Sequence, residues 1–322
     1  MVPTILSAET GDDAAHVGKF PGARGGIRRD PPRGPSDIPV MAQPTVGTDA
    51  LAAEIERIWA RAPAPFDDDD RRAIAQAVAL VDRGEARVAE RSDGAWTVNL
   101  WVKKALDLYY RTSEPTLEHE VGPLRFRDRF PSKHGLEDAA IRLVPPGAAR
   151  YGSFAGPGAT LSSCFLHLGV WVGADSLIDT WVALGTCAQI GARVKILPCT
   201  SVVGSLYPLD ARPTIVEDDC HIGSGCVIGP GTLVRRGAIL APGVTISAAT
   251  RVADLRDGSA RPLRDEVPEN AIVVPGSIPV PWSGTLAHVS AALVIGRRDP
   301  DMTPKQNLAV ATRRLGLGPV SA

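Results

Sequence analysis

The chain has 322 residues, a formal net charge of −1 and 44% hydrophobic residues, with aromatic residues making up only 5%. This composition is typical of a globular protein of about two modules. The near-zero charge argues against nucleic acid as a partner, because phosphate binding needs a clustered basic surface. No apolar run reaches the roughly eighteen residues that a membrane span requires, so we expect no membrane partner.

Cysteine and histidine usage gives no sign of a metal or disulfide framework. The five cysteines are an odd number without CxxC spacing, and we expect buried, reduced thiols in a cytoplasmic protein. The histidines are scattered, and only His167 and His221 fall within the repeats described below. A three-histidine zinc site therefore lacks its ligands, and we expect no metal.

The first part of the chain reads as an extension. Residues 1–48 are rich in Gly, Pro, Arg and Asp and contain almost no large apolar side chain, which predicts a disordered segment. The segment lacks the apolar core of a secretory signal. Met41 is an alternative start, which would make the residues before it a misassigned extension.

A small α+β domain is predicted over residues 49–115. Leu51, Ile55 and Ile58 recur at helical spacing, and a second helix follows the acidic start at residues 67–70. Turn residues at 92–94 separate two strand-like segments, 87–91 and 96–101, and residues 103–111 read as another helix. Residues 116–140 are a polar connector.

A period of six dominates residues 141–278. Each six residues of such a repeat form one short strand and a turn, and stacked coils bury an aliphatic column, which predicts a parallel β-helix. We expect the glycine that often follows the aliphatic residue to let the backbone bend at a corner. The aliphatic positions are Leu166, Val172, Ile178, Leu184, Ile190 and Ile196, then Val216, Ile222, Ile228, Val234, Leu240, Ile246 and Val252.

Two segments interrupt the repeat. Gly204–Thr214 is predicted to be a loop thrust out of a coil, and Ala253–Val267 a second, charged loop; loops on a rigid scaffold often carry binding residues. Pro275-Gly276 is expected to end the coils, and residues 279–322 to form a strand at 289–295 and a short helix. The predicted fold is mainly β: a left-handed parallel β-helix with a small N-terminal α+β domain and a short C-terminal strand and helix.

Asp179 departs most sharply from the repeat, because it stands where other turns place glycine. A carboxylate at a crowded corner can act as a general base toward an amine. The alternative is that Asp179 only accepts hydrogen bonds from turn amides. Smooth coils have no pocket of their own, so sites are expected between subunits packed as a three-fold ring.

Several motifs carry a resemblance to a known family. They lie in order from roughly residue 50 to the end and resemble those of the tetrahydrodipicolinate N-succinyltransferases. The motifs are RVAER (87–91), DGAW (93–96), RLVPP (142–146), IDTW (178–181), GTCAQIG (185–191) and PTIVEDDC (213–220).

The resemblance implies a homotrimeric, acyl-CoA-dependent transferase of lysine and diaminopimelate biosynthesis that moves succinyl to an amino dicarboxylate. It implies that Arg142 and Asp179 belong to the acceptor site, where Arg142 can hold a carboxylate and Asp179 can take a proton. Arg297 and Arg298 lie near the position of the family's C-terminal lysines and are candidates to bind coenzyme A phosphates. A solvated strand end is the alternative for these two arginines.

The chain also departs from the family pattern. Val227 stands where the family carries a glutamate, and residues 197–204 replace a glycine-rich stretch. Glu217, Asp218 and Asp219 are close in sequence and are candidates to replace the lost carboxylate. Besides succinyl-CoA and tetrahydrodipicolinate, two readings therefore stay open: a paralogue that acylates a related amino acid or cyclic imine, with acetyl-CoA as an alternative donor, and a catalytically silent trimer acting as a scaffold or sensor.

Overall fold

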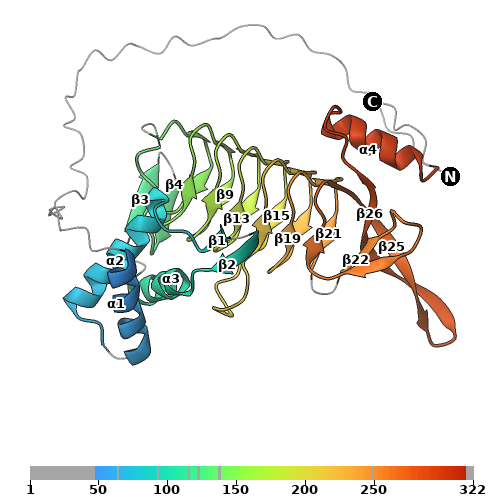
Figure 1. Ribbon diagram of the computed structural model, residues 1–322. Helices are drawn as coiled ribbons and strands as arrows, with labels where there is room; N and C mark the ends of the chain where they lie inside the picture. Colours follow the sequence, from blue (N-terminus) through green and yellow to red (C-terminus); the bar gives the residue numbers. More distant parts are fainter. Residues whose placement is uncertain are drawn as a thin grey trace, which may run out of the picture. The chain divides into compact units, whose positions relative to one another are not determined.

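The computed structural model describes residues 48–63, 65–92, 94–114, 117–121, 124–136, 139–247 and 250–316, with the side chains of 117–121 and 124–126 left out. The extension predicted at 1–48, including Met41, lies outside the described residues except for Thr48. Figure 1 shows the helices of the N-terminal module beside a long stack of coils.

The N-terminal module contains the predicted helices and hairpin: α1 (Thr48–Arg61), α2 (Asp68–Arg83), β1 (Ala89–Ser92), β2 (Ala95–Val98) and α3 (Leu100–Thr112). The three helices bury their apolar sides against one another around Ile55, Ile74 and Leu108. Asp67 caps α2, where its side chain accepts from the Asp70 amide. The strand predicted to reach Trp101 is too long, because Leu100 and Trp101 already belong to α3.

The connector predicted at 116–140 is not irregular throughout. It contains an antiparallel hairpin of β3 (Leu117–Val121) and β4 (Leu124–Asp128). Apolar and charged residues alternate in both strands. The sequence does not clearly indicate strands here, because charged residues are more typical of solvated loops. The polar connector therefore contains regular secondary structure at these residues.

The coils form the predicted left-handed parallel β-helix with three sides. Side one holds β5 (Arg142–Val144), β8 (Thr160–Ser162), β11 (Leu177–Ile178), β14 (Lys195–Ile196), β17 (His221–Ile222) and β20 (Ile239–Leu240). Side two holds β6 (Ala148–Ala149), β9 (Phe165–Leu166), β12 (Ala183–Leu184), β15 (Ser201–Val202), β18 (Val227–Ile228) and β21 (Thr245–Ile246). Side three holds β7 (Phe154–Ala155), β10 (Trp171–Val172), β13 (Gln189–Ile190), β16 (Ile215–Val216), β19 (Leu233–Val234) and β24 (Glu266–Val267).

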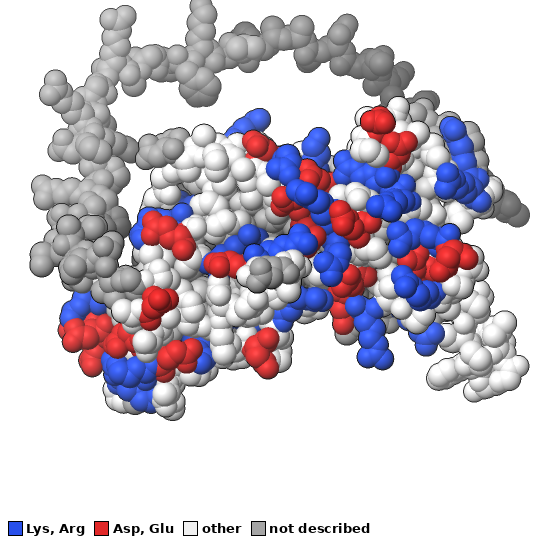
Figure 2. Space-filling model, viewed as in Figure 1, with Lys and Arg blue, Asp and Glu red and all other residues white. Residues whose placement is uncertain are grey.

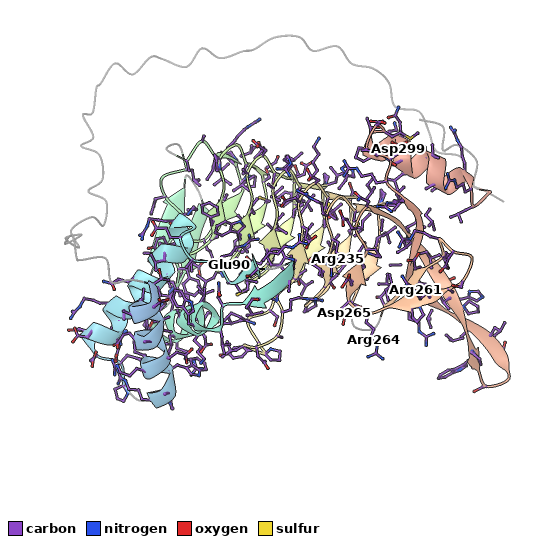
Figure 3. The ribbon with its side chains drawn as sticks, viewed as in Figure 1. Glu90, Arg235, Arg261, Arg264, Asp265 and Asp299 are labelled. Atoms are coloured by element: carbon purple, nitrogen blue, oxygen red, sulfur yellow. The ribbon has the colours of Figure 1, made fainter. Side chains whose placement is uncertain are left out.

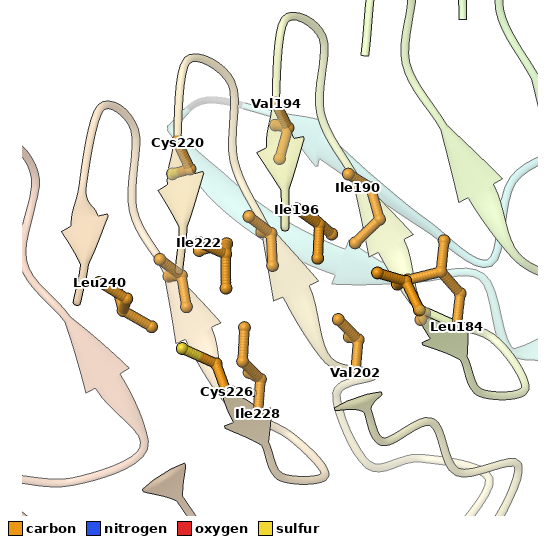
Figure 4. Packing of buried hydrophobic residues seen from close by; sticks show 14 of the residues in the cluster. Leu184, Ile190, Val194, Ile196, Val202, Cys220, Ile222, Cys226, Ile228 and Leu240 are labelled. Carbon is orange, nitrogen blue, oxygen red and sulfur yellow. The ribbon is translucent and has the colours of Figure 1, made fainter. Parts of the chain in front are cut away.

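The period-six residues fill the interior of the coils, as Figure 4 shows for Leu184, Ile190, Ile196 and their neighbours. Each such side chain is buried, and burial of one aliphatic side chain contributes roughly 1.5–3 kcal/mol. Val252 is the exception to the predicted pattern. It is buried, but it lies on a strand outside the three sides, β22 (Arg251–Asp254), which pairs with β23 (Arg261–Leu263).

The glycines after the aliphatic residues do not make the bend. A Cβ on Gly185 would lie 2.3 Å from the Gly204 amide nitrogen, and one on Gly173 would lie 2.5 Å from that of Ala192, both on the next coil. Their role is to admit the neighbouring backbone. The bend falls two residues later, at left-handed positions that other residues also occupy: Asp175, Trp181, Cys187, Arg193, Cys199 and Asp219.

The C-terminal part differs from the prediction in extent. The last residue of β25 (Ala271–Trp282) that pairs with a coil is Val273, just before Pro275 and Gly276. The strand itself continues through these two residues, paired antiparallel with β26 (Thr285–Arg297). Beyond Val273, β25 no longer pairs with a coil, so its free edge tolerates proline. The segment 253–267, predicted to be a loop, carries β23 and β24.

A closing helix, α4 (Pro304–Arg313), is present as predicted, with Leu315 just after its end. It packs on Ile239 and Ile272 and so covers the last coils of side one. None of the helices in the described part of the chain is long and apolar enough to cross a membrane.

We predict that Gly185→Ala lowers the free energy of unfolding by about 2–3 kcal/mol, because its Cβ would push two coils apart. Gly225→Ala is the control: Gly225 has φ of 68° and nothing within 4 Å of its built Cβ. We expect that change to cost about 1 kcal/mol, the strain of a left-handed alanine. Denaturant unfolding compares the two, and equal losses would contradict the close-approach explanation.

Candidate active site

Asp179 directly follows β11, at the corner between sides one and two. Its Oδ1 accepts hydrogen bonds from the Thr180 amide at 2.7 Å and the Thr180 hydroxyl at 3.1 Å. Within the described residues, Oδ2 has no hydrogen-bond partner. The turn-amide alternative is thus correct for one oxygen, and the second oxygen is left to accept a proton from a ligand.

Two neighbours shape this corner. Burial, with a smaller contribution from the charge of Asp179, raises the pKa of the Cys164 thiol to about 12. Trp181 has φ of 59° and is 66% exposed, both unusual for a large aromatic residue. The exposed indole belongs to the residue two positions after the candidate base, in the same turn. The sequence alone gave no role to Trp181, because its exposure depends on the left-handed turn.

Arg142 lies on the same side of the coils as Asp179 but does not contact it. It begins β5 and is exposed, and β5 is two strands from β11 in the stack. Two strand spacings correspond to roughly 10 Å. Within one chain, the two predicted acceptor residues therefore lie in the same region but do not touch. A ligand that carries a carboxylate at one end can span the distance between them.

Val227 faces outward on β18 in a row of small or neutral residues. Its neighbours in register are Ser201 and Thr245. Asp218 and Asp219 do not replace the missing carboxylate, because they lie at the corner of sides three and one and interact with Arg193 and Arg236. Glu217 is at that same corner and accepts from the Trp96 indole at 2.8 Å. The suggestion that these acids substitute for a glutamate at 227 is wrong within one chain.

Arg297 and Arg298 line a cleft of about 510 Å³ together with Arg236. Arg298 Nη1 donates to the Asp219 carbonyl at 2.6 Å and the Gly237 carbonyl at 3.2 Å, and its amide donates to the Asn270 carbonyl. Arg298 is therefore a clamp across successive coil corners, not a solvated strand end. Arg297 is exposed at the mouth of the cleft.

The cleft and Asp179 are separated along the stack. The cleft lies at corners that precede β17, β20 and β25, which are two to four strands beyond β11. Along the stack this separation is roughly 10–20 Å, and the two sites also lie on opposite edges of side one. An extended molecule with an anionic end at the arginines can reach the corner that holds Asp179.

The segment Gly204–Thr214 is not a loop without a partner in its own chain. The Lys103 ammonium of α3 is fully buried and donates to the carbonyls of Pro208 and Ala211 at 2.9 and 3.0 Å. The Tyr207 hydroxyl bonds to Asp107, also on α3. The loop predicted to be thrust out of a coil is therefore held by the N-terminal module of its own chain.

The cysteines and the described histidines do not form a metal site. All five cysteines are free; four are buried as expected, and Cys199 is exposed. In the part of the chain that is described, no group of three His, Cys, Asp or Glu side chains is placed to hold a metal. On the face shown in Figure 2, basic and acidic side chains are interleaved over the coils, without a patch of one sign.

Comparison with known proteins matches both halves of this architecture. Residues 50–112 match the family model described as "Tetrahydrodipicolinate N-succinyltransferase N-terminal". Residues 213–248 match the model described as "Bacterial transferase hexapeptide (six repeats)". The first match covers the helical module that holds the 204–214 loop, and the second covers the last complete coils.

Full-length relatives extend the match. The chain is 37% identical over 254 residues to the 2,3,4,5-tetrahydropyridine-2,6-dicarboxylate N-succinyltransferase of Idiomarina loihiensis, covering 77% of this chain and 90% of the relative. The chain belongs to the tetrahydrodipicolinate N-succinyltransferase family. The enzymes of the same name from Nitrobacter winogradskyi (40% over 243 residues; 72% and 86% of the two chains) and Rhodopseudomonas palustris (42% over 217; 65% and 76%) are similar too.

We predict that Lys103→Met loosens residues 204–214, because it leaves two buried carbonyls without a donor. Hydrogen exchange of these residues should become at least about tenfold faster, equivalent to roughly 1.4 kcal/mol of lost protection. Lys104→Met is the control, since Lys104 pairs with Glu56 and not with the loop. Unchanged exchange in the first variant would show that α3 does not hold the loop.

Proposed function

We propose that this protein transfers a succinyl group from succinyl-CoA to tetrahydrodipicolinate in lysine and diaminopimelate biosynthesis. The family membership supports this reaction, and the observation that carries it is the half-free carboxylate of Asp179 at an otherwise regular coil corner. The acyl-CoA is a co-substrate, and the acceptor is a small amino dicarboxylate.

Asp179 acts as the general base in this proposal. The acceptor amine attacks the thioester carbonyl, a carbon–nitrogen bond forms, and the carbon–sulfur bond breaks. Oδ2 takes the proton that the amine loses, while Thr180 holds Oδ1 and fixes the carboxylate. The leaving coenzyme A sulfur then takes this proton from Oδ2 and becomes a thiol, which restores the carboxylate of Asp179. Arg142 offers a forked donor to a carboxylate of the acceptor.

The basic cleft supplies the site for the coenzyme A phosphates. Three arginines, Arg236, Arg297 and Arg298, outnumber the two acids that line it, Asp219 and Glu269. Arginine binds phosphate through paired, charge-assisted hydrogen bonds. From this cleft the acyl end of the molecule extends along the stack toward Asp179.

We also propose a homotrimer in the cytoplasm. Side two has an outward row of small or neutral residues that no described helix covers, including Ala183, Ser201 and Val227. The arm formed by β25 and β26 exposes Trp282 and Leu286, and a two-stranded hairpin is marginally stable without a partner surface. Neighbouring subunits would cover both and bring Arg142 and Asp179 into shared clefts. The free cysteines fit a reducing compartment.

Val227 supports a second candidate acceptor. Tetrahydrodipicolinate is a cyclic imine that must be hydrated and opened, which requires proton transfers, and valine cannot move protons. An acceptor that already presents a free amine needs only one base. The alternative is therefore a paralogue that acylates such an amino dicarboxylate or a related compound, with succinyl-CoA or acetyl-CoA. A silent scaffold or sensor would bind no acyl-CoA.

We predict that Asp179→Asn lowers kcat by about a hundredfold to ten-thousandfold and leaves the fold intact, because an amide cannot take a proton. Asp175→Asn is the control: Asp175 lies on the same coil, is exposed, and has a left-handed backbone that asparagine accepts. Thiol release from succinyl-CoA in the presence of acceptor measures both. Near-normal turnover by Asp179→Asn would refute the proposed base.

We predict that Arg297→Gln raises KM for succinyl-CoA by about tenfold, the loss of one charge-assisted hydrogen bond, with kcat nearly unchanged. Arg313→Gln, on the exposed surface of α4, removes the same charge outside the cleft and should leave KM as it is. If the two variants behave alike, the cleft is not the phosphate site.

We predict that Val227→Glu increases activity on tetrahydrodipicolinate relative to an open-chain amino dicarboxylate by about tenfold or more, since it restores a proton-transfer group. Val227→Gln controls for size and polarity. The unmodified protein can also be expressed in a bacterium that cannot make diaminopimelate. Robust growth would rule out the second candidate and show that Val227 does not slow the reaction with tetrahydrodipicolinate.

A further inference from the structure

A second cleft of about 300 Å³ lies between the β1–β2 hairpin and side three of the coils, away from the corner that holds Asp179. The hairpin and the coils each contribute part of its lining. Figure 3 labels Glu90 and Arg235, which do not line the cleft but are the sequence neighbours of the lining residues Arg91 and Arg236. The lining residues are Arg87, Arg91, Trp96, Gly191, Glu217, Asp218 and Arg236.

Arg87 is fixed in this cleft without a carboxylate partner. Its guanidinium stacks against the rings of Trp96 and Trp171, with centroid distances of 5.3 and 4.6 Å. Nε donates to Gln189 Oε1 at 2.7 Å, and the Gln189 amide is turned this way because it donates to the carbonyls of Gly169, Cys187 and Ala188. Nη2 is buried, and no acceptor for it is found among the described residues.

The nearby glutamate does not neutralise Arg87. Glu217 Oε1 accepts from Trp96, and Oε2 accepts from the Arg236 amide at 2.9 Å. Burial lowers the pKa of Arg87 to about 10, which is still protonated at neutral pH. Arg87 is therefore a positive charge with an unused donor, held in place by aromatic rings.

The cleft also carries an acceptor for a cation. Asp218 Oδ1 accepts from the Ala192 amide at 2.9 Å. Its Oδ2 is 3.5 Å from both Arg193 and Arg236, too far for strong hydrogen bonds. Arg91 is about half exposed and reaches Glu217 only at 3.6 Å, so it too can turn to a ligand.

We propose that this cleft binds a zwitterionic amino acid, with its carboxylate toward Arg87 and Arg91 and its ammonium group toward Asp218. A carboxylate matches the forked donors of arginine, and it supplies the acceptor that Arg87 lacks. An ammonium group pairs with Asp218. The volume suits a small molecule and not a nucleotide cofactor. The site is separate from the acceptor site proposed above.

The test is calorimetric binding of L-glutamate and of L-lysine to the full chain. An Arg142→Gln background is used, so that binding at the proposed acceptor site does not contribute. We expect saturable binding of at least one of them, with a Kd below about 1 mM. Succinate, which lacks the ammonium group, and cadaverine, which lacks the carboxylate, should each bind about tenfold more weakly or worse.

Matched variants locate the binding. Arg91→Gln and Asp218→Asn should each weaken it by about tenfold, whereas Arg83→Gln, an exposed arginine paired with Glu85, should leave it unchanged. Arg91 and Asp218 are surface groups, so both variants are expected to fold, and thermal unfolding checks this. No saturable binding of either amino acid, equal binding of succinate, or unweakened binding by the Asp218 variant would overturn the proposal, and none of these results bears on turnover at Asp179.

Discussion

Successive coils are stacked at the distance between two hydrogen-bonded strands, and the rest of the structure depends on this constraint. Each inward aliphatic residue packs on the equivalent residue of the previous coil. Every side of the stack therefore repeats the same outward, inward and corner positions. The backbones approach so closely at Gly173 and Gly185 that a methyl group has no room.

The corners of the stack carry different chemistry because of this constraint. The corner between sides one and two holds Asp179 and the exposed Trp181, while the corner between sides three and one holds the arginine cleft. Side three is covered by the N-terminal module, and part of side one by α4. None of the described helices covers side two or the end of the β25–β26 arm, which is why a complete site requires neighbouring subunits in our proposal.

The repeat itself could be predicted from the sequence, because its signal is local: an aliphatic residue every six positions faces inward. Asp179 stands out in the sequence for a similar reason, as a carboxylate in a position that often holds glycine, and its role as the base stays a proposal. Contacts between distant segments could not. Arg87 meets Gln189, and Lys103 meets the carbonyls of the 204–214 loop, across about a hundred residues, and no local pattern specifies such pairs. The role of the glycines was also mistaken, since crowding by the next coil is a property of the stack.

Active-band sedimentation tests the central claim most directly, because it reports the mass of the species that performs the reaction. Enzyme is layered over a solution of succinyl-CoA, acceptor and a thiol reagent, and the moving zone of released thiol is followed. We predict that this zone moves with a mass three times that of the chain. Activity that travels at the mass of a single chain would contradict the proposal that the site is completed between subunits.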